Sequence, residues 1–283
     1  MKKLSNQFPI EKMSQVFGVT RSGYYRFLSS PKGKRVQEEA RLSKEIERVF
    51  YENKKRYGSP RIFMELKEKG IRCSEKRVAK IMRNNKLVAK RRREWKGKKL
   101  TVKEKKPNLL NQDFKANKKN AKWVSDITYI RTSKGWAYLC AVMDLYSRKI
   151  VGHAVKQHMK KELVVQALEQ AISRRGSIDK GLIFHSDQGS QYGSDVVGKS
   201  LKKNKIVGSM SGKGSCYDNA PMESFFNSFK RECLGTEIFQ DVETAKKEIF
   251  NYIECYYNNK RKHSALGYLS PVKFEEKHEN SLC

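Results

Sequence analysis

Three acidic residues stand at positions where a catalytic carboxylate could lie. Asp126 interrupts a strand-like run over residues 123–130, Asp187 closely follows the strand-like run over 182–185, and Glu223 lies at the start of a helix-like segment. An acid inside an apolar strand is costly to bury unless it is paired or binds a metal. In a sheet flanked by helices, acids at strand ends and at one helix start can converge. We therefore take these three residues as candidate catalytic residues and metal ligands.

Carboxylates supply the oxygen ligands that Mg²⁺ prefers. Two such ions, ~3.5–4 Å apart, can activate an attacking oxygen and stabilise the leaving oxygen in an in-line displacement at phosphorus. The expected cofactor is therefore a pair of Mg²⁺ ions, with Mn²⁺ as a substitute. Hydrolysis and transesterification differ only in whether water or a DNA 3′-hydroxyl attacks. Asp144 is the main alternative ligand, although its place before residues 146–148 favours a turn or a salt bridge.

The segment that carries Glu223 has the pattern of an amphipathic helix. Asp218 and Asn219 could cap it and Pro221 could begin it. The residues at apolar helical spacing are Met222, Phe225, Phe226, Phe229 and Cys233. On the neighbouring stripe, Glu223 is followed by Asn227 and Lys230 at i+4 and i+7. Lys230 could therefore hold a phosphate of the substrate that the carboxylate acts on.

Three polar residues near these segments have simpler structural interpretations. His185 could reach the site, yet a histidine beside a core strand is more often a hydrogen-bonded part of the structure. Arg261 and His263 more plausibly brace the last helices than take part in catalysis.

Around the acids, the hydrophobic pattern predicts an α/β fold. Expected strands cover residues 123–130, 136–145, 149–155, 182–185 and 206–210, and expected helices cover 161–175, 195–203 and a segment from about 221. Three meandering strands followed by strand–helix alternation indicate a mixed sheet flanked by helices, the ribonuclease H-like arrangement. We assign residues 123–235 to this catalytic core and 236–283 to a C-terminal helical extension.

The N-terminal part of the chain is basic and predicted to be all-helical. The whole chain carries 61 Lys and Arg against 30 Asp and Glu, a net charge of +31, which points to nucleic acid. Within residues 1–85, helices over 9–17 and 21–28, the second capped by Thr20, outline a helix-turn-helix.

A second helix-turn-helix candidate pairs a helix over 61–69 with one over 75–84 that Ser74 caps. Lys76, Arg77, Lys80 and Arg83 are expected to face outward, toward DNA, with Val78, Ile81 and Met82 inward. A solvated basic face explains these charges equally well.

Residues 86–122 read as a basic linker. They hold fifteen Lys or Arg against three acids, including Arg91, Arg92 and Arg93, and show no hydrophobic period. Such a segment is expected to be extended and could follow a phosphate backbone.

Several protein classes are disfavoured. The six cysteines show no close pairs, against a zinc ribbon or disulfide scaffold. No apolar run approaches the ~20 residues of a membrane span, and no secretory signal is apparent. We expect a cytoplasmic protein that has no membrane partner.

Four stretches together resemble the second-frame transposases of the IS-three group of bacterial insertion sequences, in the retroviral integrase superfamily. They are WVSDITY at 123–129, HSDQGSQY at 185–192, DNAPMESFF at 218–226 and YNNKRKH at 257–263, and residues 57–87 resemble that group's helix-turn-helix. The 35 residues between Asp187 and Glu223 match integrases, but such an interval also arises by chance.

The resemblance implies a DDE transposase that uses Asp126, Asp187 and Glu223 as metal ligands, with Lys230 and Arg231 at the DNA. It implies Mg²⁺-dependent 3′-end cleavage and strand transfer, with element ends and target DNA as double-stranded partners and a homo-oligomer on DNA. No zinc module is visible, so the helical N-terminal region is expected to recognise DNA. No coiled-coil heptads are visible either, so a product of an upstream reading frame is expected as a fusion or partner. The alternatives are a nuclease of the same fold without strand transfer, and a non-catalytic DNA-binding regulator.

Overall fold

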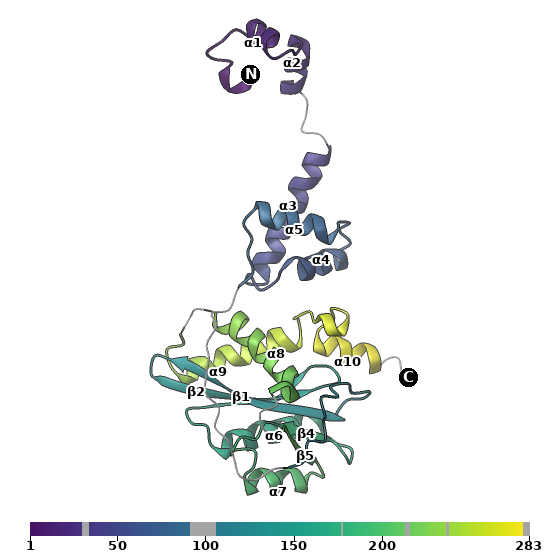
Figure 1. Cartoon of the computed structure of the whole chain (residues 1–283), viewed down its shortest axis with the longest axis vertical. Helices are drawn as coiled ribbons and strands as arrows, with labels where there is room; N and C mark the ends of the chain where they lie inside the picture. Colours follow the sequence, from purple (N-terminus) through teal and green to yellow (C-terminus); the bar gives the residue numbers. More distant parts are fainter. Residues whose placement is uncertain (30–33, 91–105, 177, 213–215, 236–237, 280–283) are drawn as a thin grey trace. The chain divides into compact units, whose positions relative to one another are not determined.

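The computed structural model describes residues 1–29, 34–90, 106–176, 178–212, 216–235 and 238–279 (Figure 1). The chain forms two compact units, Met1–Ala89 and Lys90–Cys283. The predicted residues Arg91, Arg92 and Arg93 lie outside the described residues. In the described part, no helix has both the length and the apolar character to cross a membrane.

The N-terminal unit is helical, as the sequence predicted. It contains a short 3₁₀ turn, η1 (Lys2–Leu4), followed by α1 (Ile10–Val16), α2 (Arg21–Ser29), α3 (Lys34–Glu52), α4 (Ser59–Glu68) and α5 (Glu75–Asn84). Both predicted caps are present: Thr20 Oγ1 accepts from the Gly23 amide at 3.1 Å, and Ser74 Oγ accepts from the Arg77 amide at 3.3 Å. These caps satisfy amides that the first helical turn leaves without partners.

Helices α3, α4 and α5 pack on one another around a small apolar core. Its fully or nearly fully buried members include Ile46, Val49, Ile62, Leu66 and Val78. The inward face predicted for α5 is confirmed, because Val78, Ile81 and Met82 are all buried.

The second unit is built on a five-stranded mixed sheet in the order β3-β2-β1-β4-β5. The strands are β1 (Lys122–Thr132), β2 (Gly135–Asp144), β3 (Ile150–Lys156), β4 (Ile183–Ser186) and β5 (Val207–Met210). The pairs β1–β2 and β2–β3 are antiparallel, whereas β1–β4 and β4–β5 are parallel. This meander followed by parallel strands is the predicted ribonuclease H-like arrangement.

Helices cover both faces of the sheet (Figure 1). On one face lie α6 (Lys161–Arg175) and α7 (Asp195–Lys203). On the other lie α8 (Ala220–Phe229), which packs on β1, and α9 (Val242–Phe250), which packs on β2 and β3. The 3₁₀ turn η2 (Cys216–Asn219) precedes α8. The π-helical segments η3 (Lys230–Leu234) and η4 (Asn251–Asn258), the turn η5 (Ser264–Leu266) and α10 (Pro271–Glu279) complete this layer.

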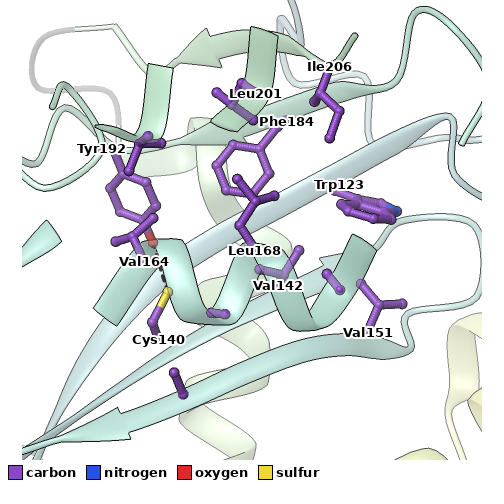
Figure 2. Close-up of a cluster of buried hydrophobic side chains, with 14 of the residues drawn as sticks. Trp123, Cys140, Val142, Val151, Val164, Leu168, Phe184, Tyr192, Leu201 and Ile206 are labelled. Atoms are coloured by element: carbon purple, nitrogen blue, oxygen red, sulfur yellow. Dashed lines mark hydrogen bonds between the residues drawn. The ribbon is translucent and has the colours of Figure 1, made fainter. Parts of the chain in front are cut away.

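The main core lies between the sheet and helices α6 and α7 (Figure 2). Trp123 and Leu168 are fully buried in it. A polar contact crosses this core where Ser125 Oγ and Tyr192 Oη lie 2.8 Å apart. Burying this much apolar surface is the dominant stabilising contribution to the unit.

Residues 106–122 do not form the extended linker that their composition indicated. Leu110 is buried, the Met210 amide donates to the Pro107 carbonyl, and the Leu109 amide donates to Ser209 Oγ. This segment is therefore joined to β5 before β1 begins. Composition could not reveal this, because these hydrogen bonds join the segment to residues about 100 positions later in the chain. The four-part division at 85, 122 and 235 stays a prediction.

Gly152 on β3 provides a test of this architecture. A Cβ at this position would overlap the Ala167 carbonyl oxygen of α6 and lie 2.8 Å from the Ala171 Cβ. We expect Gly152→Ala to lower the free energy of unfolding by about 1–3 kcal/mol, because strand and helix must separate. Urea titration measures the change.

Gly198→Ala is the matched control, since Gly198 lies in α7 and nothing stands within 4 Å of an added Cβ. It should be neutral or stabilising by up to about 1 kcal/mol, through helix propensity. Equal losses in both variants would contradict the close packing of β3 on α6.

Candidate active site

Parallel pairing of β1 with β4 brings two of the three predicted acids side by side. The last paired residues are Val124 and His185, and Asp126 and Asp187 each lie two positions further along. Neighbouring strands are ~4.8 Å apart, so residues at the same offset on paired strands are neighbours. Both aspartates are half-buried. The sheet register therefore places two carboxylates at one end of β4.

Local hydrogen bonds orient each aspartate. Asp126 Oδ1 accepts from the Ile127 amide at 2.7 Å, and Asp187 Oδ1 accepts from the Gly189 amide at 3.0 Å. Both acids act on the same neighbour, Tyr129. Burial is the main cause that raises the pKa of Tyr129, and the negative charges of Asp187 and Asp126 each raise it further. A shared electrostatic neighbourhood agrees with the register.

Glu223 lies in the first turn of α8 and is exposed. The apolar face of α8 is buried as predicted, with Phe225 and Phe229 among its members. Asn219 Nδ2 donates to the Ser125 carbonyl at 2.9 Å. Because Ser125 precedes Asp126, this bond fixes the start of α8 beside the first aspartate.

The three acids do not form one closed cluster. Among the residues that the structure describes, no three His, Cys, Asp or Glu side chains are grouped so that they could hold a metal ion. The structure therefore brings Asp126 and Asp187 together and leaves Glu223 on the adjacent helix. Asn227 is exposed and Lys230 is half-buried at the junction of α8 with η3.

The capping role expected for Asp218 and Asn219 is wrong. Asn219 occupies the N-cap position of α8, but its side chain makes no capping bond. The buried Asp218 carboxylate accepts from the Gly212 amide, Asn108 Nδ2 and Gln112 Nε2 at 2.9–3.0 Å. Sequence reasoning missed this site because two of the donors come from more than 100 residues earlier.

His185 is a structural residue, as its position beside a core strand suggested. It is fully buried, with Ser209 Oγ 2.9 Å from Nδ1 and Ser211 Oγ 3.1 Å from Nε2. Burial lowers its pKa to about 4. His185 is therefore neutral at physiological pH and holds β4 to β5 just before Asp187.

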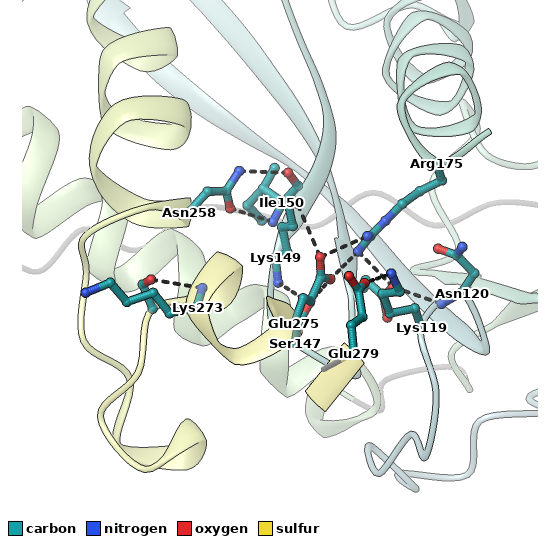
Figure 3. Close-up of polar contacts among 12 residues, drawn as sticks. Lys119, Asn120, Ser147, Lys149, Ile150, Arg175, Asn258, Lys273, Glu275 and Glu279 are labelled. Atoms are coloured by element: carbon teal, nitrogen blue, oxygen red, sulfur yellow. Dashed lines mark hydrogen bonds and ion pairs between the residues drawn. The ribbon is translucent and has the colours of Figure 1, made fainter. Parts of the chain in front are cut away.

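Asp144 belongs to an ion-pair network at the opposite end of β2 from the β1–β2 turn. Figure 3 shows Arg175 and Glu275 of this network. It is fully buried and lies 3.0 Å from Arg175 Nη2, and it accepts from the Asn120 and Tyr146 amides. Arg175 also pairs with Glu275 of α10 at 2.6 Å. These contacts confirm the salt-bridge and turn interpretation of Asp144.

A second buried ion pair supports the end of α8. Arg261 donates to both carboxylate oxygens of Glu232 at 2.8 and 2.9 Å and to Ser228 Oγ at 3.0 Å. Tyr252 Oη also donates to Glu232, and His263 Nε2 lies 3.3 Å from Arg261 Nη1. The predicted bracing role of Arg261 and His263 is confirmed.

The predicted DNA-contacting residues have different environments. On α5, Lys76, Lys80 and Arg83 are exposed and Arg77 is half-buried. Arg231 is 3.2 Å from the buried Glu232 carboxylate, so this cation already has an internal partner.

Two buried histidines give the fold a defined pH response. Burial is the main cause that lowers the pKa of His153 and of His185 from 6.5 to about 4. Between pH 6.5 and 4 the unfolded chain thus binds more protons than the folded chain, so stability must fall as the pH falls. We expect urea titrations across this window to show that loss.

A His153→Asn, His185→Asn double variant should show a flatter dependence, whereas His158→Asn, at an exposed residue, should keep the wild-type slope. If the double variant kept the wild-type dependence of stability on pH, the two buried histidines would not be the origin of the acid sensitivity.

The fold and the acid pair define an integrase-type catalytic unit joined to a helical unit, and comparisons with known proteins agree. "Integrase core domain" families match residues 116–216 and 223–278, and an "HTH-like domain" family matches residues 37–95. The HTLV-2 integrase catalytic core domain in complex with magnesium aligns at TM-score 0.38 and 17% identity over 55% of this chain and 94% of that one.

Closer relatives come from insertion sequences. The chain is 40% identical to "Transposase InsF for insertion sequence IS3A" of Escherichia coli K12, over 98% of this chain and 97% of that protein. It is also 40% identical to the "Insertion element IS600 uncharacterized 31 kDa protein" of Shigella sonnei, over 94% and 98% of the two chains. The chain belongs to the IS3 family of insertion-sequence transposases, and it is a DDE-type transposase, a polynucleotidyl transferase.

Proposed function

We propose that this transposase cuts DNA 3′ ends and joins them to target DNA with Asp126, Asp187 and Glu223 as its catalytic acids. The observation that carries the proposal is the register of β1 and β4, which sets Asp126 beside Asp187. We take Glu223 as the third acid, because Asn219 ties the start of its helix to the carbonyl that precedes Asp126.

The donor chemistry of the three proposed acids suits divalent metal ions, although the structure does not group all three together. Asp126 and Asp187 offer carboxylate oxygens, which suit Mg²⁺ and its substitute Mn²⁺. They are half-buried, so water and a phosphate can still reach them. Three carboxylates repel one another, and approach of Glu223 to the pair therefore requires positive charge between them. When bound, two Mg²⁺ ions would neutralise charge that develops at phosphorus and lower the pKa of the attacking oxygen.

The chain's own groups then have separate tasks. The backbone amides of Ile127 and Gly189 hold the two aspartates in one orientation. Lys230, on the same helical stripe as Glu223, would contact a phosphate next to the reacting one. In cleavage, water attacks phosphorus and the 3′-oxygen leaves. In joining, that 3′-hydroxyl attacks a target phosphate and a second 3′-oxygen leaves.

We further propose that the helical unit holds the element ends through α5 and that a homo-oligomer assembles on DNA, with the upstream-frame product as fusion or partner. Exposed Lys76, Lys80 and Arg83 on α5 suit phosphate contacts. The basic residues Arg91, Arg92 and Arg93 would add to this attraction. The work would be done on DNA in the bacterial cytoplasm, at the nucleoid.

Replacing single acids tests the site. Asp126→Asn, Asp187→Asn and Glu223→Gln should each reduce cleavage and strand transfer by at least ~10²-fold, because each removes a negatively charged metal ligand. DNA binding should remain. Gel assays with labelled element ends and Mg²⁺ or Mn²⁺ measure both steps.

Asp195→Asn is the matched control, since Asp195 is exposed in the first turn of α7. It should react like the wild type. Wild-type joining by Asp187→Asn would eliminate the proposed site. Element ends that already carry the nick distinguish a transposase from a nuclease without strand transfer. The nuclease would hydrolyse DNA and form no joined products.

The basic face of α5 generates a second test. A Lys80→Ala, Arg83→Ala variant should bind element ends more weakly, with the slope of log K against log salt reduced by about 2 if each side chain contacts one phosphate. Fluorescence anisotropy over a salt series measures this slope. Lys67→Ala, an exposed cation on α4, is the control. An unchanged slope in the double variant would show that α5 has only a solvated basic face.

A further inference from the structure

One segment donates hydrogen bonds to the two backbone carbonyls that directly precede the paired aspartates. The Ser211 amide donates to the Ser186 carbonyl at 2.9 Å, and Asn219 Nδ2 donates to the Ser125 carbonyl at 2.9 Å. Each of these two accepting serines is the residue just before an aspartate. The donors belong to what we call the β5–α8 connection, the described residues 211, 212 and 216–219. This connection is therefore attached to the backbone beside both aspartates.

Asp218 joins the two parts of the β5–α8 connection. Its side chain is buried, and its Oδ2 atom accepts from the Gly212 amide at 2.9 Å. The same oxygen accepts from Asn108 Nδ2 at 2.9 Å, and Oδ1 accepts from Gln112 Nε2 at 3.0 Å. An ionised carboxylate only accepts hydrogen bonds, so it can serve three neutral N–H groups at once. One buried side chain thus links the end of β5, the segment before β1 and the turn before α8.

Two of the three donors cannot change their role. The Gly212 donor is a backbone amide. The Asn108 side chain is oriented by its own Oδ1, which accepts from two backbone amides of the same turn at 3.1 and 3.0 Å. Gln112 is exposed, and its terminal amide can turn to present its oxygen in place of its nitrogen. The Oδ2 side of Asp218 therefore requires an acceptor, whereas the Oδ1 side could equally carry a donor.

The place of Asp218 in the chain connects it to the proposed third acid. Glu223 lies five residues later, in the first turn of α8. The described residues hold no cluster in which all three acids are grouped, so the point where α8 begins decides how far Glu223 is from the aspartates. A displacement of about 1 Å at a reacting centre can lower a rate by about 10²-fold. Small shifts of the turn before α8 therefore matter for catalysis.

We propose that Asp218 is a positioning residue for the transposase reaction: it fixes the start of α8 relative to Asp126 and Asp187 and so sets the place of Glu223. The inference rests on the proposed function, because it assumes that Glu223 is the third acid. In this role Asp218 touches neither DNA nor metal. It acts only through the hydrogen bonds that hold the turn before its helix.

Replacing the carboxylate tests this role. Asp218→Ala should lower the joining of element ends that already carry the nick by about 10- to 100-fold at saturating DNA, because Glu223 is displaced. The affinity for those ends, measured by fluorescence anisotropy, should stay at the wild-type value. In EDTA, hydrogen-exchange mass spectrometry should show faster exchange of the α8 amides and wild-type exchange in β1 and β4.

A conservative variant separates hydrogen bonding from charge. Asp218→Asn keeps an acceptor for Gly212 and Asn108, and its new amide group can donate to Gln112 once that side chain turns. It should therefore join DNA at nearly the wild-type rate. Asp218→Leu, of similar size but without an acceptor, should behave like Asp218→Ala. A metal ligand at this position would show the opposite pattern, with Asp218→Asn as defective as Asp218→Ala.

A double variant tests whether Asp218 acts through Glu223. Independent effects on a rate add as free energies, whereas residues that act through one another do not. Asp218→Ala should therefore cause no further loss of joining when it is added to Glu223→Gln.

Asp241→Ala is the matched control. Asp241 caps α9, where its carboxylate accepts from the amide and the hydroxyl of Thr244 at 2.9 and 2.8 Å. The control thus removes a carboxylate from the start of a neighbouring helix and should join DNA like the wild type. All rates are compared at a temperature where thermal unfolding shows that every variant is folded.

Several results would overturn the proposal. They are wild-type joining by folded Asp218→Ala, slower joining with wild-type exchange in α8, equal defects in the Asn and Ala variants, and a fully additive loss in the double variant. Failure of the proposed function gives a different result, because Glu223→Gln alone would then join DNA at the wild-type rate. The exchange measurement is independent of activity, so it reports on the attachment of α8 in either case.

Discussion

The parallel pairing of β1 with β4 is the constraint on which the candidate site depends. It sets Asp126 beside Asp187 although 60 residues separate them in the sequence. Keeping two carboxylates at neighbouring positions carries an electrostatic cost, and the fold must offset that cost elsewhere. The buried core under α6 and α7 holds the strands in this register, and His185 adds a link between β4 and β5 through Ser209 and Ser211. The acids are thus positioned by strands that the buried core of the unit holds together.

The third acid is held by different means. Helix α8 is fixed at its start by Asn219 and at its end by the Arg261–Glu232 pair that follows in η3. A buried ion pair is weak evidence for net stability, but removal of either partner leaves an uncompensated charge. This pair therefore specifies where the C-terminal segment lies against α8. The sheet therefore positions the two aspartates, and a braced helix positions the proposed third acid separately from them.

Much of this organisation could be predicted from the sequence. The bounds of α6 and α7 follow directly from their hydrophobic period, and Ser74 identifies the start of α5 by cap chemistry. What failed depends on contacts between distant residues. Asp218 resembles a helix cap in sequence, yet its donors Asn108 and Gln112 come from a segment whose composition is that of a linker. Local pattern carries no information about such pairs, so neither the buried acid nor the folded segment could be found.

The Arg261–Glu232 contact also bears on when the enzyme becomes competent during synthesis. Glu223 leaves the ribosome well before Arg261, and until Arg261 emerges the carboxylate of Glu232 lacks the guanidinium that donates to both of its oxygens. A nascent chain would hence carry all three acids while the helix that bears the third still lacks its brace. Domains generally fold as units during translation. The order of the residues thus places the completion of this brace after the synthesis of all three proposed acids.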